Sequence, residues 1–149
     1  MLNRLERVFA SFQRNDVRYL VIGGIAAVLH GVPRATFDLD ILIDPSHENA
    51  ERLLRSLLEA GLGTAALITP EQLLAHESTV FKDWVRIDVQ TATPGIEFGP
   101  CWERKNTMHF GDQDFHVLCR EDLIASKRAA HRPVDLEDVR LLEVPEAGE

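Results

Sequence analysis

Two aspartates between residues 21 and 44 carry the clearest chemical signal in this sequence. Asp38 and Asp40 are two positions apart, and the apolar residues at 39 and 41–43 predict a buried strand around them. Side chains two apart on a strand point to the same face, so both carboxylates could bind one or two metal ions together. A buried carboxylate is costly unless it is paired or binds a metal. A metal site is therefore the interpretation that explains both acids.

A third aspartate lies in a second predicted strand. In the segment from Val85 to Gln90, apolar residues alternate with polar ones, and Asp88 is among the polar set. Three hard oxygen ligands favour Mg²⁺ or Mn²⁺ over zinc. Two such ions could activate an attacking hydroxyl and stabilise a leaving pyrophosphate, which is the chemistry of nucleotidyl transfer. The alternatives are a solvent-facing strand residue for Asp88 and a turn or strand-start residue for Asp38.

A glycine pair precedes the acids. Gly23 and Gly24 separate a predicted strand, Tyr19 to Ile22, from a short apolar helix, Ile25 to Leu29. Without side chains, this turn lets the backbone approach a phosphate, and a helix N-terminus favours negative charge. An ordinary tight turn is the alternative, but the two acids that follow strengthen the phosphate-binding interpretation.

The residues of this segment resemble those of a known family. Their order is similar to the signature of the polymerase-beta-like nucleotidyltransferase superfamily, in the minimal single-domain branch that includes aminoglycoside adenylyltransferases and AbiEii-type toxins. The residues that carry the resemblance are Gly23, Gly24, Ala26, Gly31, Arg34, Thr36, Asp38, Asp40 and Ile41. Asp88, in the segment RIDVQ, matches the third acid of the superfamily by its strand context.

The resemblance implies a metal-dependent enzyme that uses a nucleoside triphosphate (NTP). In it, Asp38 and Asp40 hold Mg²⁺ or Mn²⁺, and Asp88 completes the metal site and helps to take the proton from the acceptor hydroxyl. Gly23 and Gly24 contact the triphosphate. The chain departs from the commoner form of the superfamily, which has Gly-Ser at the glycine pair, and its loop before the acids is short.

Three further residues are candidates for nucleotide binding. Arg34 and Thr36 alternate with the acids if the strand begins early, and Arg34 could then bind phosphate bidentately, although pairing with an acid is an equal alternative. Lys127 could reach the outer phosphates as a point charge. It begins a segment, KRAAHRPVDLEDV, that resembles the ending of several minimal nucleotidyltransferases. In this segment we expect Arg132 on a solvated helix face and Asp135 as the N-cap of the last helix.

Hydrophobic periodicity and turn residues predict an α+β or α/β fold with helices packed on a mixed sheet. We expect one nucleotidyltransferase-like domain over residues 1–149, with a frayed tail from about 144 to 149. The expected helices lie at 2–14, 25–29, 46–61, 70–76, 121–131 and 135–142. The expected strands lie at 19–22, around 38–43, at 80–84 and at 85–90, followed by a hairpin over 107–118 in which the turn is at 111–113.

Composition narrows the function classes. The net charge of −8 argues against nonspecific binding of nucleic acid. Cys101 and Cys119 are interpreted as buried packing residues, and the six histidines show no zinc-ligand pair. The sequence shows no apolar run of membrane-spanning length and no signal peptide, so we expect a soluble, cytoplasmic protein that does not contact a membrane.

The acceptor is left open between a small molecule, a tRNA end and a partner protein. A one-sided cleft in a chain of this size also predicts a homodimer or a partner protein that closes over the base. The alternative to an enzyme is an inactive member of the same fold that binds a nucleotide or a partner, as in a toxin–antitoxin pair. A metal-dependent phosphohydrolase is disfavoured because it usually needs histidines in the cluster.

Overall fold

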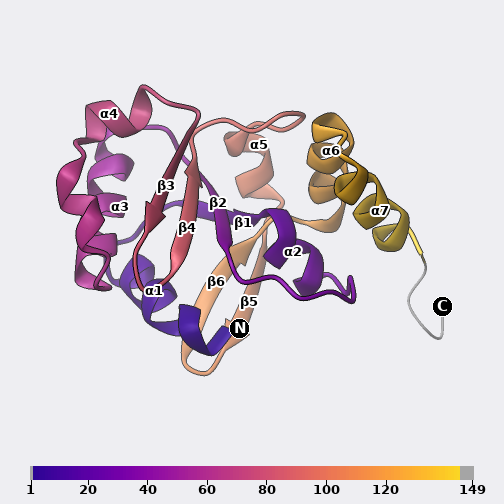
Figure 1. The fold of residues 1–149 in the computed structure, drawn as a ribbon, viewed down its shortest axis with the longest axis horizontal. Coiled ribbons are helices and arrows are strands. Elements are labelled where there is room, and N and C mark those ends of the chain that lie inside the picture. The colour runs from indigo at the N-terminus through magenta and orange to yellow at the C-terminus, as the bar shows by residue number, and fades with distance from the viewer. Residues whose placement is uncertain (1, 145–149) are drawn as a thin grey trace.

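The computed structural model describes residues 2–144, and in them six strands form a single mixed sheet in the order β3-β4-β2-β1-β6-β5. The strands are β1 (Tyr19–Ile22), β2 (Leu39–Ile43), β3 (Ser78–Lys82), β4 (Arg86–Gln90), β5 (Asn106–Phe110) and β6 (Gln113–Val117). The helices are α1 (Leu2–Arg14), α2 (Gly23–Leu29), α3 (His47–Glu59), the 3-10 helix η1 (Gly63–Leu67), α4 (Pro70–Leu74), α5 (Phe98–Glu103), α6 (Arg120–Ala130) and α7 (Pro133–Leu142). The predicted α+β class with a mixed sheet is confirmed. Figure 1 shows α3 and α4 on one side of the strands and α6 and α7 on the other.

The centre of the sheet joins segments that are distant in the sequence. Strand β2 pairs antiparallel with β1 and parallel with β4, and β1 in turn pairs parallel with β6. Two antiparallel pairs, β3 with β4 and β5 with β6, complete the edges. In this register Asp40 lies opposite Ile22 on one side and opposite Asp88 on the other.

One face of the sheet is apolar and fully covered. Its central side chains are Val21, Leu39, Ile41, Ile43, Ile87 and Val89, and all are buried. Helix α1 packs on this face, where Phe9 stacks on Phe115 of β6 with ring centroids 4.8 Å apart. Helix α3 packs beside α1, and its Leu53 and Leu57 are fully buried. Burial of these side chains supplies most of the hydrophobic stabilisation of the domain.

The opposite face is covered only in part. Helix α2 packs on β1 and β2 and contacts α6, so Leu20 and Ile22 are buried beneath it. Over β2 and β4 this face carries Asp40, Asp88 and Gln90, all partly exposed. Because side chains alternate along a strand, the same two strands are apolar on one face and acidic on the other.

Several predicted boundaries are wrong at the ends of elements. Strand β2 begins only at Leu39, so the predicted alternation that includes Arg34 and Thr36 lies in a loop. Strand β3 spans Ser78–Lys82 and ends before Trp84. Neither α5 nor η1 was predicted. These are short elements whose helical form depends on tertiary packing more than on a periodic pattern.

The start of the last helix also differs from the prediction. Helix α7 begins at Pro133, with Arg132 as its N-cap residue, so Asp135 is the third helical residue and not the cap. Its carboxylate accepts a hydrogen bond from the Arg132 backbone N–H at 3.3 Å. Proline fits the first helical position because the amide hydrogen that it lacks would have no helical partner there.

Cys101 and Cys119 are both buried, which confirms their predicted packing role. Within residues 2–144, no helix has the length and apolar character needed to cross a bilayer. The expected frayed tail falls almost wholly outside the described residues.

Candidate active site

Asp40 and Asp88 face the same cavity from neighbouring strands. The two residues are directly paired across the parallel β2–β4 ladder, so their side chains project from the same face of the sheet. Both line a cavity of about 170 Å³, together with Gly23 at the start of α2. The structure thus brings together two acids that are 48 positions apart in the chain, and it places them against the glycine turn.

Gly23 is required by this arrangement for two reasons. Its φ of +68° lies in the left-handed region that side chains disfavour. A Cβ atom at this position would also lie 2.3 Å from Oδ2 of Asp40. The missing side chain is therefore what allows the carboxylate to stand against the first turn of the helix, and this explains why a glycine turn and an acidic strand occur together.

Asp38 lies at the rim of this site. It precedes β2, it is exposed, and it does not line the cavity itself. Its Oδ2 is 3.8 Å from Nη1 of Arg86, two residues before Asp88 on β4. The charge of Asp38 still acts on Asp40, because it is one of the causes that raise the pKa of Asp40.

The electrostatics of the cavity favour a cation. Burial, and then the nearby charges of Asp88 and Asp38, raise the pKa of Asp40 to about 6, while Arg132 and Arg86 oppose the shift. Asp88 is oriented by the Ser78 hydroxyl, which donates a hydrogen bond to its Oδ1 at 2.5 Å. Negative charges that repel one another at an open cavity are stabilised by a bound metal ion.

The carboxylate oxygens of this site fit a metal ion that a substrate would also coordinate. In the part of the chain that the structure describes, no group of three or more His, Cys, Asp or Glu side chains closes around a metal position. Mg²⁺ does not need such a cage, because it keeps waters and binds through one or two carboxylates together with substrate phosphates. Asp40 and Asp88, with Asp38 at the rim, provide this kind of open oxygen site.

Three of the predicted nucleotide-binding residues, Gly24, Arg34 and Thr36, lie together directly after Gly23. A Cβ atom on Gly24 would lie 2.9 Å from Oγ1 of Thr36 and 3.0 Å from Nη2 of Arg34. The loop before β2 therefore folds back over the start of α2. Arg34 is also paired with an acid, since its Nη2 is 3.0 Å from Oδ2 of Asp138 on α7. About a third of the Arg34 side chain remains exposed.

Lys127 reaches the cavity wall, but its charge is already paired. Its Nζ lies 2.8 Å from Oδ2 of Asp138 and 3.7 Å from Oδ1 of Asp135, and all three side chains are buried. Arg132 completes the cluster through a two-pronged contact with Asp135, at 2.7 and 3.1 Å. Lys127 thus joins α6 to α7 at the point where both helices border the cavity.

The cavity has polar lining residues that sequence reasoning missed. Arg132, Gln90, Thr93 and Ser126 all border it. Gln90 could have been found, because it is two positions after Asp88 on the same alternating strand. Arg132 was expected on a solvated helix face. Its side chain is mostly exposed, but as the N-cap residue of α7 it also borders the cavity. The sequence predicts the break between the two helices, but no pattern in it indicates that the break brings Arg132 to this cavity.

The fold and the site agree with the family that a comparison with known proteins found. A mixed sheet with paired acids on adjacent central strands, beside a glycine turn that opens a helix, is the arrangement that the resemblance to nucleotidyltransferases predicts. The family model described as "Nucleotidyltransferase of unknown function (DUF6036)" matches residues 2–146. The chain therefore belongs to this nucleotidyltransferase family. A comparison with curated proteins found no significant match.

Proposed function

We propose that this protein transfers a nucleoside monophosphate from an NTP to a hydroxyl group of an acceptor. The observation that supports this most strongly is the register of β2 and β4, which sets Asp40 beside Asp88 in one cavity with Gly23. Membership of the nucleotidyltransferase family supports the same reaction type.

In this proposal, Asp38, Asp40 and Asp88 hold Mg²⁺ or Mn²⁺. The metal would polarise the triphosphate and offset the charge that develops on the leaving pyrophosphate. Asp88 is the proposed proton acceptor, because the Ser78 hydroxyl fixes one of its oxygens and leaves the other for the acceptor. The acceptor oxygen forms a bond to the α-phosphorus, the bond from that phosphorus to the oxygen bridging to the β-phosphorus breaks, and pyrophosphate leaves.

The phosphates are proposed to lie along the glycine turn. Backbone N–H groups of Gly23 and Gly24 provide donors there, and Arg34 and Thr36 border the same turn. The exposed part of the Arg34 guanidinium gives further donors for a phosphate oxygen. Lys127 adds positive charge at the cavity wall while it remains paired with Asp138.

The test is transfer of labelled nucleotide. The purified protein is incubated with each of the four NTPs, labelled at the α-phosphate, in Mg²⁺, with tRNA, protein extract and a small-molecule pool as acceptors. We expect a labelled product and pyrophosphate release, both lost in Asp40→Asn and Asp88→Asn. Asp112→Asn, an exposed acid in the β5–β6 turn, is the matched control and should behave as the wild type.

The alternative, an inactive member that binds a nucleotide or a partner, predicts a different result. It predicts nucleotide binding without transfer to any acceptor offered and without pyrophosphate release. That outcome would contradict the proposed reaction.

A further inference from the structure

Arg132 presents an exposed positive charge on the wall of the acid cavity. Within the part of the chain that the structure describes, two cations line this cavity, Arg132 and Lys127. The Lys127 side chain is 5% exposed, and its charge is paired with Asp138. The Arg132 side chain is 71% exposed. A ligand that enters the cavity therefore meets the guanidinium of Arg132 before the buried amine of Lys127.

A buried carboxylate fixes the guanidinium of Arg132. Its Nε and Nη2 donate to the two oxygens of Asp135 at 2.7 and 3.1 Å, and the Asp135 side chain is only 2% exposed. The amine of Lys127 lies 3.7 Å from the same carboxylate. A planar guanidinium that donates to both oxygens of a carboxylate is fixed in orientation as well as in position. The charge of Arg132 is thus oriented before a ligand binds, which lowers the cost of binding.

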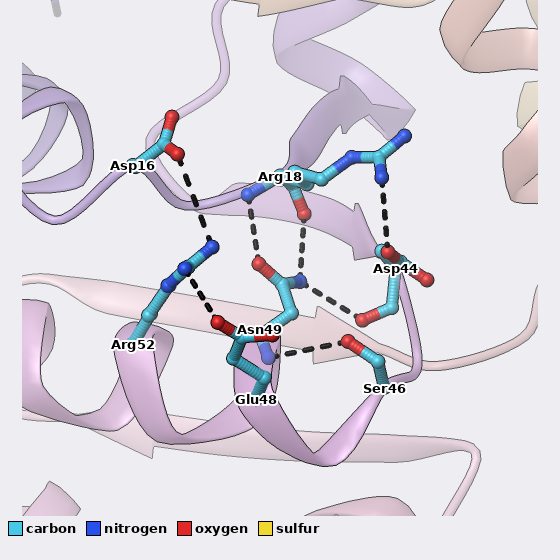
Figure 2. A network of polar contacts seen from close by, with 7 residues as sticks. All are labelled: Asp16, Arg18, Asp44, Ser46, Glu48, Asn49 and Arg52. Carbon is cyan, nitrogen blue, oxygen red and sulfur yellow. Dashed lines mark hydrogen bonds and ion pairs between the residues drawn. The ribbon is translucent and has the colours of Figure 1, made fainter.

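An arginine on α3 shows how an ordinary surface ion pair differs from this one. Arg52 contacts Glu48 at 2.6 Å and Asp16 at 3.9 Å, but these two acids are 73% and 92% exposed (Figure 2). Exposed pairs of this kind are weak, because water and salt screen both charges. Arg132 differs because its carboxylate is buried, so its orientation is maintained.

The contact with Asp135 leaves part of the guanidinium for a ligand. A guanidinium has five N–H donors, and this contact uses one on Nε and one on Nη2. Among the described residues, no other group accepts a hydrogen bond from this side chain. Both N–H groups of Nη1 and the second one of Nη2 therefore remain for a ligand.

The charge of Arg132 acts across the cavity on the acids. Burial and the neighbouring carboxylates raise the pKa of Asp40, and Arg132 is the largest of the charges that oppose this shift. In return, Asp135 first and then Asp40 raise the pKa of Arg132. Within residues 2–144, Arg132 makes no ion pair with Asp40 or Asp88, although all three line the cavity. Carboxylates on the sheet and a cation on the helices suit a metal ion and an anion that bind together.

The size of the cavity indicates which part of a ligand it takes. Its volume of about 170 Å³ is below the roughly 300 Å³ at which sites for whole small molecules begin. The cavity is therefore suited to a compact anionic group of a larger ligand. A phosphate group that coordinates the metal has this size and charge.

We propose that Arg132 is a catalytic residue that binds the phosphates of the NTP from the wall formed by α6 and α7. This inference rests on the proposed nucleotidyl transfer. A phosphate group then lies between the guanidinium and the metal ion held by Asp40 and Asp88 on the sheet. The guanidinium stabilises the negative charge that develops on the phosphate oxygens as pyrophosphate leaves. Asp135 holds the guanidinium in place for this contact.

The test compares metal binding with nucleotide binding in Arg132→Gln. Mn²⁺ alone, and then an ATP analogue with a methylene group between the α- and β-phosphorus in the presence of Mn²⁺, are titrated at pH 7.5. Removal of a positive charge favours a bound cation but disfavours a bound phosphate, so the two affinities should not fall together. We expect Mn²⁺ to bind at least as tightly as to the wild type, and the analogue to bind about tenfold more weakly. Arg132→Lys, which keeps the charge but loses the two-pronged contact, should recover only part of the affinity for the analogue.

Arg140→Gln is the matched control. Arg140 lies on the same helix and makes the same two-pronged contact with an acid three positions away, Glu137, at 3.0 and 2.7 Å, but it does not line the cavity. This variant should bind Mn²⁺ and the analogue as the wild type does. AMP and pyrophosphate, titrated in the same variants, show which phosphates the guanidinium contacts, and at least one of them should bind more weakly to Arg132→Gln.

The outcomes separate this assignment from the proposed reaction. Undiminished Mn²⁺ binding shows that Arg132→Gln keeps the acids in place, so a folding defect is not mistaken for a lost phosphate contact. If this variant binds the analogue as tightly as the wild type, or loses Mn²⁺ and the analogue by the same factor, the assignment is wrong and the proposed reaction stands. If the wild type does not bind the analogue in the presence of Mn²⁺, the proposed reaction fails and the assignment fails with it.

Discussion

Two clusters of charged side chains border the same cavity, and they are built in opposite ways. In the cluster between α6 and α7, two carboxylates, Asp135 and Asp138, are matched by Lys127, Arg34 and Arg132. In the acid cluster, Asp40 and Asp88 lie side by side. Within residues 2–144 the one ion pair of these acids is the long contact between Asp38 and Arg86 at the rim.

The pKa values of the acids show the consequence. Burial opposes ionisation of Asp135, but the hydrogen bonds and charge of Arg132 outweigh it, so the pKa of Asp135 lies below its usual value. Burial and neighbouring carboxylates instead raise the pKa of Asp40 to about 6. The first cluster is complete within the protein and holds the helices together. In the second, the positive charges of Arg86 and Arg132 do not offset the carboxylates enough to prevent the raised pKa of Asp40, so this cluster is suited to a bound cation.

Removal of the central cation from the α6–α7 cluster should produce the largest loss of stability. Lys127→Met leaves Asp138 buried with only Arg34 as a partner, and we expect a loss of about 3–5 kcal/mol in the free energy of unfolding. Urea denaturation measures this. Lys82→Met, on the exposed edge strand, is the control and should cost less than about 0.5 kcal/mol. A loss as small as that of the control would mean that the cluster does not hold α7 to α6.

Gly23→Ala should disturb the acid cluster through its backbone. The added methyl group would meet Asp40, and φ is positive, so we expect a loss of about 1–3 kcal/mol in stability. Gly63→Ala is the matched control, since a Cβ there meets nothing within 4 Å. Thermal unfolding of both variants should separate them clearly, and equal melting temperatures would contradict the close approach of the glycine to Asp40.

Asp40→Asn should stabilise the metal-free protein at alkaline pH. The pKa of Asp40 is about 6 in the folded state and near 3.8 in the unfolded state, so the folded state binds more protons between these values. The stability due to this group is therefore fully present below about pH 4 and is lost as the pH rises through 6. We expect the variant to gain about 1–2 kcal/mol at pH 8, allowing for partial hydration, and almost nothing at pH 4. A gain that does not depend on pH would contradict the raised pKa.

The rim ion pair should have the smallest effect. Arg86→Gln removes the partner of Asp38, but both side chains are about half exposed, so the loss in stability should stay below about 1 kcal/mol. The variant should raise the pKa of Asp40 further, because Arg86 is one of the charges that lower it. Carboxyl chemical shifts followed through a pH titration test this, and an unchanged or lower pKa would show that Arg86 does not act on Asp40.

The sequence predicts the acidic strands better than it predicts their surroundings. The pattern of apolar and polar residues placed Asp40 and Asp88 on strands, and the glycine pair indicated the turn at Gly23. Both signals lie in the local sequence. The parallel pairing of β2 with β4, which sets the two acids opposite each other, depends on contacts across almost fifty residues. The local patterns could not show that these acids share one site, and that expectation came from the resemblance to the nucleotidyltransferase superfamily.

Other parts of the site depend on tertiary contacts that have no local signal. Lys127 was predicted to reach phosphates, and its ion pair with Asp138 follows only from the angle between α6 and α7. Asp135 was expected as a cap, but it is used as a partner of Arg132.

Asp40 and Asp88 are proposed to form one divalent-cation site. Electron paramagnetic resonance of Mn²⁺ titrated into the protein at pH 7.5 tests it directly, with and without the methylene ATP analogue. We predict that Mn²⁺ binds, that the analogue tightens its binding, and that Asp40→Asn and Asp88→Asn each abolish the effect while Asp112→Asn does not. Mn²⁺ binding that is unchanged in the variant lacking both Asp40 and Asp88 would contradict the account.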